Sequence, residues 1–189
     1  MQKLRRSGLL AAALFALGSS AAGAADPAVH ASLAADLDGD GKTELAVALG
    51  GPEVTLVILA PTPPHDALSV VASGTGIAWT QAGEDARLDQ DPATGSLRLT
   101  TSNYGIGRNK WEQVLTIAWR DGAWRIAGLD HSGFDTLTAE GADTCSANLL
   151  TGRVIIDAPD GTRSERRLTG PAPTLARWQA DRVGEICDW

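Results

Sequence analysis

The chain has 189 residues, a formal net charge of −7 at pH 7 and 43% hydrophobic residues. This length is enough for one domain with a modest core. Nucleic acid and anionic lipid surfaces both favour clusters of Lys and Arg, so an acidic chain is a poor partner for either. We therefore expect no nucleic-acid binding, while partners that are basic or bridged by a metal ion stay open.

The N-terminal segment has the three parts of a secretory signal peptide. The basic stretch MQKLRR precedes the apolar stretch GLLAAALFALG, and SSAAGA ends in an A-x-A cleavage pattern at Ala22 and Ala24. The apolar stretch is shorter than the roughly 20 residues of a membrane-spanning helix. We expect residues 1–24 to be removed, and residues 25–189 to form a single β-rich domain that is periplasmic or secreted and not inserted in a membrane.

Strand patterns follow in the first half of that domain. In TELAVAL, Leu45, Val47 and Leu49 alternate with alanines, which predicts a strand whose apolar face carries the larger side chains. VTLVILA is apolar on both faces, as in a central strand. The Pro-rich segment APTPPHDA predicts a connection, and GSLRLTTS alternates as a further strand with Leu97 and Leu99 on one face.

The clearest hairpin lies in KWEQVLTIAWRDGAWRIAGL. Asp121-Gly122 is a preferred two-residue type I′ turn. This turn predicts three cross-strand pairs on one face: Trp119 with Trp124, Ile117 with Ile126, and Leu115 with Gly128. Trp111 falls on the same face. We interpret this face as core packing, and the alternative is an exposed platform on which a ligand stacks.

A second hairpin is expected in GRVIIDAPDGTRSERRL. Its return strand carries the charges that protect an exposed sheet edge from pairing with another chain: Arg163, Glu165, Arg166 and Arg167. The final stretch, PTLARWQADRVGEICDW, fits a short helix or an irregular covering strand, and both stay open. No interior segment shows a long helical period, so we predict a mainly β fold, an antiparallel meander of hairpins.

Cys145 and Cys187 are the only two cysteines. An even pair in an exported chain predicts a disulfide, which would tie the C-terminal tail to the body of the domain. The chain has no C-x-x-C motif, which argues against thiol redox chemistry.

The most specific motif is DLDGDGKTEL, which starts at Asp36. Asp36, Asp38 and Asp40, followed by a glycine, match positions 1, 3, 5 and 6 of a calcium-binding loop, and position 7 would offer the carbonyl of Lys42. Position 12 is Val47 instead of the bidentate Glu of an EF-hand, and the acid comes at position 9, Glu44. Four acids this close repel one another, and a plain turn does not need them. We therefore predict calcium, because magnesium rarely uses an all-protein cage.

This loop resembles the calcium-binding loops of FG-GAP/VCBS-type repeats, found in integrin-α-like β-propellers. The resemblance implies side-chain ligands at Asp36, Asp38, Asp40 and Glu44 and a main-chain ligand at Lys42. The loop occurs once, and the chain is too short for a full propeller of at least four blades. The segments NYGIGRNKW, WRDGAWRIAGLD and CSANLLTG also resemble a group of exported bacterial VCBS-repeat-like proteins, a resemblance that implies no activity.

Catalytic patterns are weak. Asp130, His131 and Ser132 are neighbours, but neighbours on an extended chain point to opposite faces and make no triad. His30, in an N-terminal tail, and His65, in the Pro-rich connection, are too scattered for a zinc site. Two carboxylates could form a glycosidase site, but the sequence selects none.

Three functions stay open. The first is a calcium-stabilised β module that binds a protein, peptide or glycan partner. The others are a hydrolase with unidentified carboxylates and a non-catalytic assembly or stabilising factor. The candidate partner surface lies in TSNYGIGRNK, where Tyr104 and Arg108 sit among turn residues, and in the loop DHSGFDTLTAEGADTCSAN; ordinary loops are the alternative. A deep polar pocket would favour the enzyme, and an exposed aromatic patch the binding module.

Overall fold

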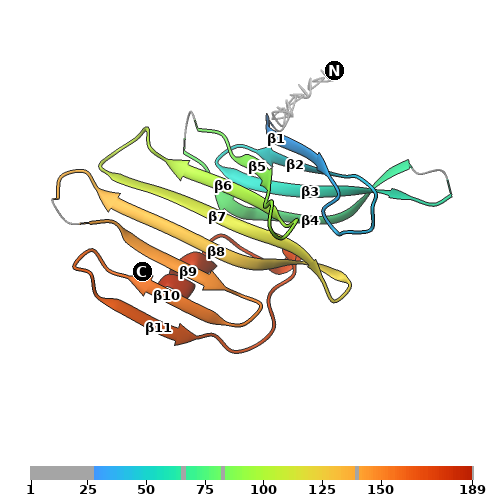
Figure 1. The fold of residues 1–189 in the computed structure, drawn as a ribbon. Coiled ribbons are helices and arrows are strands. Elements are labelled where there is room, and N and C mark those ends of the chain that lie inside the picture. Colours follow the sequence, from blue (N-terminus) through green and yellow to red (C-terminus); the bar gives the residue numbers. More distant parts are fainter. Residues whose placement is uncertain (1–27, 65–66, 82–83, 139–140, 189) are drawn as a thin grey trace, which may run out of the picture.

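The computed structural model describes residues 28–64, 67–81, 84–138 and 141–188 (Figure 1). The predicted leader and His65 lie outside these residues. Within them, four strands form one sheet: β1 (Ala28–Ala35), β2 (Glu44–Gly50), β3 (Glu53–Thr62) and β4 (Ala67–Trp79). Seven strands form the other: β5 (Arg87–Gln90), β6 (Leu97–Asn103), β7 (Asn109–Arg120), β8 (Ala123–Asp135), β9 (Asp143–Asn148), β10 (Arg153–Asp157) and β11 (Arg163–Arg167).

Both sheets are antiparallel, and in each the strands lie side by side in chain order. Tight turns make this arrangement possible. At the β7–β8 turn, Asp121 and Gly122 have φ angles of 51° and 72°, the positive values that a type I′ turn requires at both central residues. The prediction of a mainly β, antiparallel meander is confirmed.

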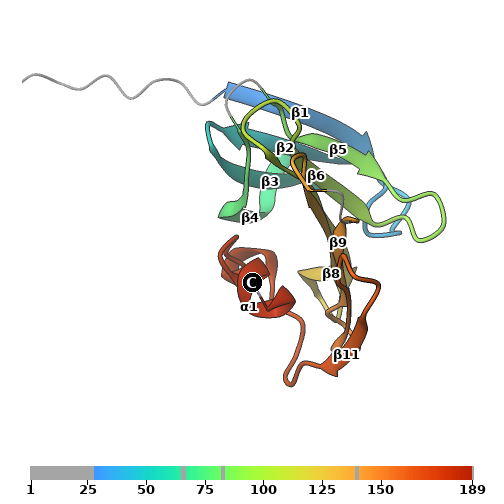
Figure 2. The same ribbon diagram turned by 90° about the vertical axis from the view of Figure 1, so that its left-hand side faces the viewer.

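The C-terminal segment completes the core. After β11 the chain forms the 3-10 turn η1 (Leu175–Arg177) and the short helix α1 (Arg182–Cys187), which lie on the same side of the seven-stranded sheet as β4 (Figure 2). Trp178 is fully buried in the core, and its indole Nε1–H donates to the Ile77 carbonyl at 2.9 Å. The short helix is therefore the correct alternative for this segment. Within the described residues, none of the helices has the length and apolar character needed to span a membrane.

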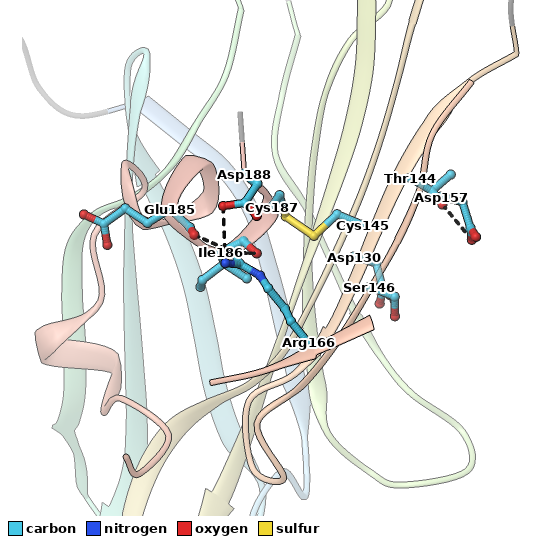
Figure 3. Close-up of a disulfide and its surroundings, with 10 residues drawn as sticks. All are labelled: Asp130, Thr144, Cys145, Ser146, Asp157, Arg166, Glu185, Ile186, Cys187 and Asp188. Carbon is cyan, nitrogen blue, oxygen red and sulfur yellow. Dashed lines mark hydrogen bonds and ion pairs between the residues drawn. A yellow bond between two sulfur atoms is a disulfide. The ribbon is translucent and has the colours of Figure 1, made fainter. Parts of the chain in front are cut away.

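The tail is also attached covalently, by the predicted disulfide between Cys145 of β9 and Cys187 of α1 (Figure 3). Beside it, the Arg166 guanidinium donates to the carbonyls of Glu185 and Ile186 and pairs with Asp188 at 3.2 Å. The cysteine prediction is confirmed. A structural disulfide indicates an oxidising compartment outside the cytoplasm.

The prediction for the apolar face of β2 is wrong. Ala46 and Ala48 face the core and are fully buried, whereas Leu45, Val47 and Leu49 are half-buried on the opposite face. The reason lies in the neighbouring strand, since β3 places large side chains directly opposite the two alanines. Large residues paired with small ones fill the interior without overpacking it.

The β7–β8 hairpin follows the predicted register near its turn and departs from it farther along. Trp119 pairs with Trp124, with ring centroids 5.5 Å apart, and Ile117 pairs with Ile126. A bulge in β8 then shifts the register, so Leu115 lies opposite Leu129 and not Gly128. The extra residue keeps both leucines in the core.

Tryptophan packing is confirmed for two of the three tryptophans expected on that face. The Trp124 side chain is buried, and Trp119 packs against the core. Trp111 lies on the same face but is only half-buried. It borders a cleft at the edge of the core. Its assignment to the core is therefore wrong.

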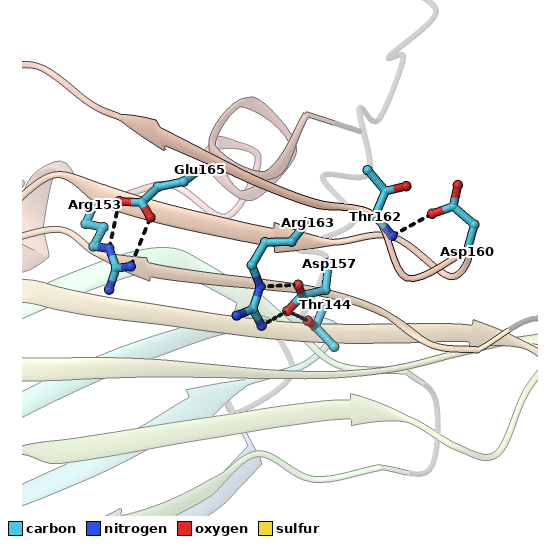
Figure 4. Close-up of polar contacts among 7 residues, drawn as sticks. All are labelled: Thr144, Arg153, Asp157, Asp160, Thr162, Arg163 and Glu165. Carbon is cyan, nitrogen blue, oxygen red and sulfur yellow. Dashed lines mark hydrogen bonds and ion pairs between the residues drawn. The ribbon is translucent and has the colours of Figure 1, made fainter.

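Strand β11 is an edge of the seven-stranded sheet, as its charges predict. Arg153 pairs in a bidentate manner with Glu165 at 2.8 and 2.9 Å, and Arg163 pairs with Asp157 at 2.6 and 2.9 Å (Figure 4). Hydrogen bonds from the guanidinium groups hold the pKa values of both carboxyls below their usual range. These exposed pairs stabilise little but keep the edge solvated.

His30 does not lie in a tail, because β1 begins two residues before it. Its Nδ1 lies 3.0 Å from an oxygen of Asp85, and its Nε2 lies 3.2 Å from the Gly51 carbonyl. These contacts link β1 to the loops after β2 and β4. His30 therefore has a structural role and does not belong to a metal site.

Candidate functional site

The acidic loop between β1 and β2 brings three of the predicted calcium ligands together. One carboxylate oxygen each from Asp36, Asp38 and Asp40 lies within 4.8 Å of the other two. Among the described residues, this is the one group of three or more His, Cys, Asp or Glu side chains close enough to share an ion. Carboxylate oxygens are the ligands that calcium prefers, so the donor chemistry fits that ion.

Hydrogen bonds within the loop hold these carboxylates in place. Asp36 accepts the N–H groups of Gly39 and Gly41 at 2.8 and 3.0 Å. Asp38 accepts the N–H of Asp40 at 3.0 Å, and Asp40 accepts that of Lys42 at 2.8 Å. The backbone turns sharply because Gly39 and Gly41 have φ angles of 83° and 85°, a region that favours glycine.

Glu44, the fourth predicted side-chain ligand, lies behind this group and not within it. Its side chain is only 1% exposed, and its Oε2 accepts the Leu37 N–H at 2.7 Å. Burial raises the pKa of this carboxyl, and the nearby charges of Asp38 and Asp40 raise it further, while the Leu37 hydrogen bond opposes them. A cation at the loop would offset this unfavourable charge. Lys42 is exposed, and its carbonyl remains a predicted ligand.

Glu84 organises the predicted partner loop that follows β6. Its Oε1 accepts the N–H groups of Tyr104 and Gly105 at 2.6 and 2.7 Å, and its Oε2 accepts the hydroxyl of Ser102 at 2.7 Å. The Ser102 bond is the main reason why the pKa of Glu84 is lowered. The Tyr104 side chain is 52% exposed, so it is available to a partner.

Arg108 connects that loop to a cleft. Its Nη2 lies 2.5 Å from Oδ2 of Asp135, at the end of β8. Asp135 lines a cleft of about 460 Å³ on the concave face of the seven-stranded sheet, together with Trp111, His131 and Asp143. Most of its lining comes from the two segments predicted as a partner surface, TSNYGIGRNK and DHSGFDTLTAEGADTCSAN. The second segment is not the long loop that we expected, because β8 extends to Asp135 and β9 begins at Asp143.

His131 lies in the wall of the cleft. Its ring stacks on Trp111, with centroids 6.1 Å apart and planes 21° from parallel. Asp130 points to the opposite face, where it accepts the Ser146 hydroxyl at 2.7 Å. The geometry therefore agrees with the expectation that Asp130, His131 and Ser132 form no triad.

Burial lowers the pKa of His131 to about 4, so the ring is neutral at pH 7. As the pH falls from about 6.5 towards 4, the unfolded chain gains a proton at this histidine before the folded chain does. Stability should therefore decrease across this window, by about 1–2 kcal/mol once partial exposure is allowed for. Urea unfolding at several pH values should show a shallower decrease for His131→Gln than for wild type or His30→Gln. Equal slopes in all three proteins would contradict this result.

No protein-family model matches the sequence, and neither a curated protein nor a solved structure is significantly similar to it. The fold and the sites define the chain as a mainly β, disulfide-bonded domain with an acidic loop and an aromatic cleft.

Proposed function

We propose that the protein is an exported, calcium-stabilised β module that binds a partner in the periplasm or outside the cell. The observation that carries the calcium proposal is the group of three carboxylates within 4.8 Å of one another. The hydrogen bonds that they accept come from uncharged N–H groups of the loop's own backbone, and no ion pair to them is found among the described residues. A divalent cation would neutralise their mutual repulsion.

Two features support export. The leader pattern of residues 1–24 predicts secretion, and a disulfide is stable in an oxidising compartment. Extracellular calcium modules often bind in the range of about 0.1–1 mM. The predicted compartment and the predicted ion are therefore compatible.

The cleft and the neighbouring loop support binding to a partner. Exposed aromatic side chains rimmed by polar groups mark interaction sites on soluble domains. Here Tyr104, Phe134 and Trp79 are each about half exposed, close to charged residues. The hydrolase stays an alternative, since the cleft also holds two carboxylates, Asp135 and Asp143, and turnover of a bound ligand would identify it.

Calcium should raise the melting temperature of the chain, because a ligand that binds only the folded state stabilises it. The expected stabilisation is about 2.7 kcal/mol when free calcium is about a hundredfold above the dissociation constant. Thermal unfolding in millimolar calcium, in chelator and in equal magnesium measures this shift. Calcium should give the largest shift.

Asp38→Ala and Asp40→Ala should abolish the calcium shift, because each removes a carboxylate of the group. Both variants should be as stable as wild type in chelator, or slightly more so, since repulsion is relieved. Glu185→Gln, on the distant helix α1, is the matched control and should keep the full shift. A wild-type melting curve that is the same in calcium and chelator would show that the loop is only a turn.

A further inference from the structure

The concave face of the seven-stranded sheet carries two hollows that share a wall. The larger, of about 460 Å³, and the smaller, of about 230 Å³, are both lined by Trp111 and His131. The smaller one extends towards α1, where Asp181 and Gly184 form its far side. The two hollows adjoin at this stacked pair of rings and are together called the concave groove below.

Aromatic rings from three strands line the concave groove. Trp79, at the end of β4, is 46% exposed and faces the smaller hollow. His131 of β8 and Trp111 of β7 border both hollows, and their two rings stack on one another. Aromatic rings exposed in a hollow of a soluble domain mark a binding site.

Polar atoms converge on the floor of the larger hollow, which is formed by Gly133. A Cβ placed on this glycine would lie 2.9 Å from Oδ1 of Asp143 and 3.6 Å from Nε2 of His131. The lack of a side chain lets a carboxylate oxygen and an imidazole nitrogen approach the sheet closely at this point. Asp135 in the larger hollow adds an acceptor, and the amide of Gln113 in the smaller hollow adds a donor.

We propose that the concave groove binds a neutral oligosaccharide, which identifies the partner class of the binding module and so rests on the function proposed above. A sugar ring has an apolar C–H face, which packs on the electron-rich face of an aromatic ring. Its hydroxyl groups donate and accept hydrogen bonds, and the floor and rim of the groove offer both kinds of group.

Other ligand classes fit the groove less well. An apolar ligand would cover the Asp143 carboxylate without offering it a hydrogen bond. A phosphorylated or acidic ligand would face the carboxylates of Asp143 and Asp135, while Arg108 is already engaged by Asp135 at 2.5 Å. The larger hollow, of about 460 Å³, is within the usual size range of small-molecule sites.

Binding can be measured on the mature chain in millimolar calcium, first on an array of neutral, uronic-acid and sulfated oligosaccharides and then by calorimetry with the best neutral probe. Trp79→Ala removes an exposed ring of the groove, so the variant should fold and should bind about tenfold more weakly. Gly133→Val fills the floor and should abolish binding. Leu150→Ala, which truncates an equally exposed apolar side chain outside the concave groove, should bind like wild type.

Failure to bind any neutral oligosaccharide, or preferential binding of the acidic ones or of peptides, would overturn the proposal. Equal losses in Leu150→Ala and Trp79→Ala would also overturn it, since the ligand would then lie elsewhere. The calcium-dependent melting shift is a separate measurement. If that shift is present and no sugar binds, only the ligand class is wrong; if sugar binds without the shift, only the calcium proposal is wrong.

Discussion

Replacing Trp178 with alanine should lower the free energy of unfolding by about 3–5 kcal/mol, the usual cost of truncating a large buried aromatic side chain. Trp178 is fully buried, where the C-terminal segment meets both sheets. Its indole also donates the 2.9 Å hydrogen bond to the Ile77 carbonyl, and truncation leaves that buried oxygen without this donor. The cavity left by the side chain and the lost hydrogen bond both lower the free energy of unfolding.

Urea unfolding of the oxidised chain, followed by far-UV circular dichroism, measures this effect. Trp178→Phe keeps most of the ring volume but not the N–H, so its stability should lie between those of wild type and the alanine variant. Trp79→Ala is the matched control, because that side chain is 46% exposed and should cost much less. If Trp178→Ala and Trp79→Ala unfolded at the same urea concentration, the C-terminal segment would not be part of the core.

The fold class could be predicted because its signals are local. Alternating apolar residues and a two-residue turn at Asp121-Gly122 determine strands and a hairpin without reference to the rest of the chain. The orientation of β2 was not predictable in this way, since both of its faces are apolar. The neighbouring strand β3 determines this orientation, because it places Leu56 and Ile58 opposite Ala48 and Ala46.

The acidic loop and the concave groove also differ in whether local sequence signals could predict them. The acidic loop could be found because its side chains lie within one turn, where spacing alone brings Asp36, Asp38 and Asp40 together. The concave groove combines residues of β4, β7, β8 and β9, and its floor depends on a glycine opposite Trp111. No local pattern distinguishes such a tryptophan from one in the core.

Strands β1, β4, β5 and β9 were also missing from the sequence prediction. In β4, the register shifts against β3 at two places, so the apolar residues of this strand do not follow a period of two. Strand β5 is only four residues long, too short for a clear alternation. In both cases the pairing partner determines the strand, and the partner is known only from the fold.

Removing the disulfide should destabilise the chain by up to about 4 kcal/mol, the chain-entropy value for a cross-link between residues 42 apart in sequence. The link joins β9 to the end of α1, next to the contacts of Arg166 with the carbonyls of Glu185 and Ile186. Without it, the tail depends on these contacts and on Trp178. We therefore expect α1 to open first, before the sheets unfold.

The Cys145→Ala/Cys187→Ala variant tests this by urea unfolding and by hydrogen exchange, in which the amides of α1 should lose protection more than those of β7 and β8. Arg166→Met is the matched control: it removes the neighbouring attachment of the tail but leaves the covalent link, so its loss of stability should be smaller. Wild type under reducing conditions should behave like the double variant. A double variant with wild-type stability and wild-type protection of α1 would mean that packing around Trp178 alone holds the tail in place.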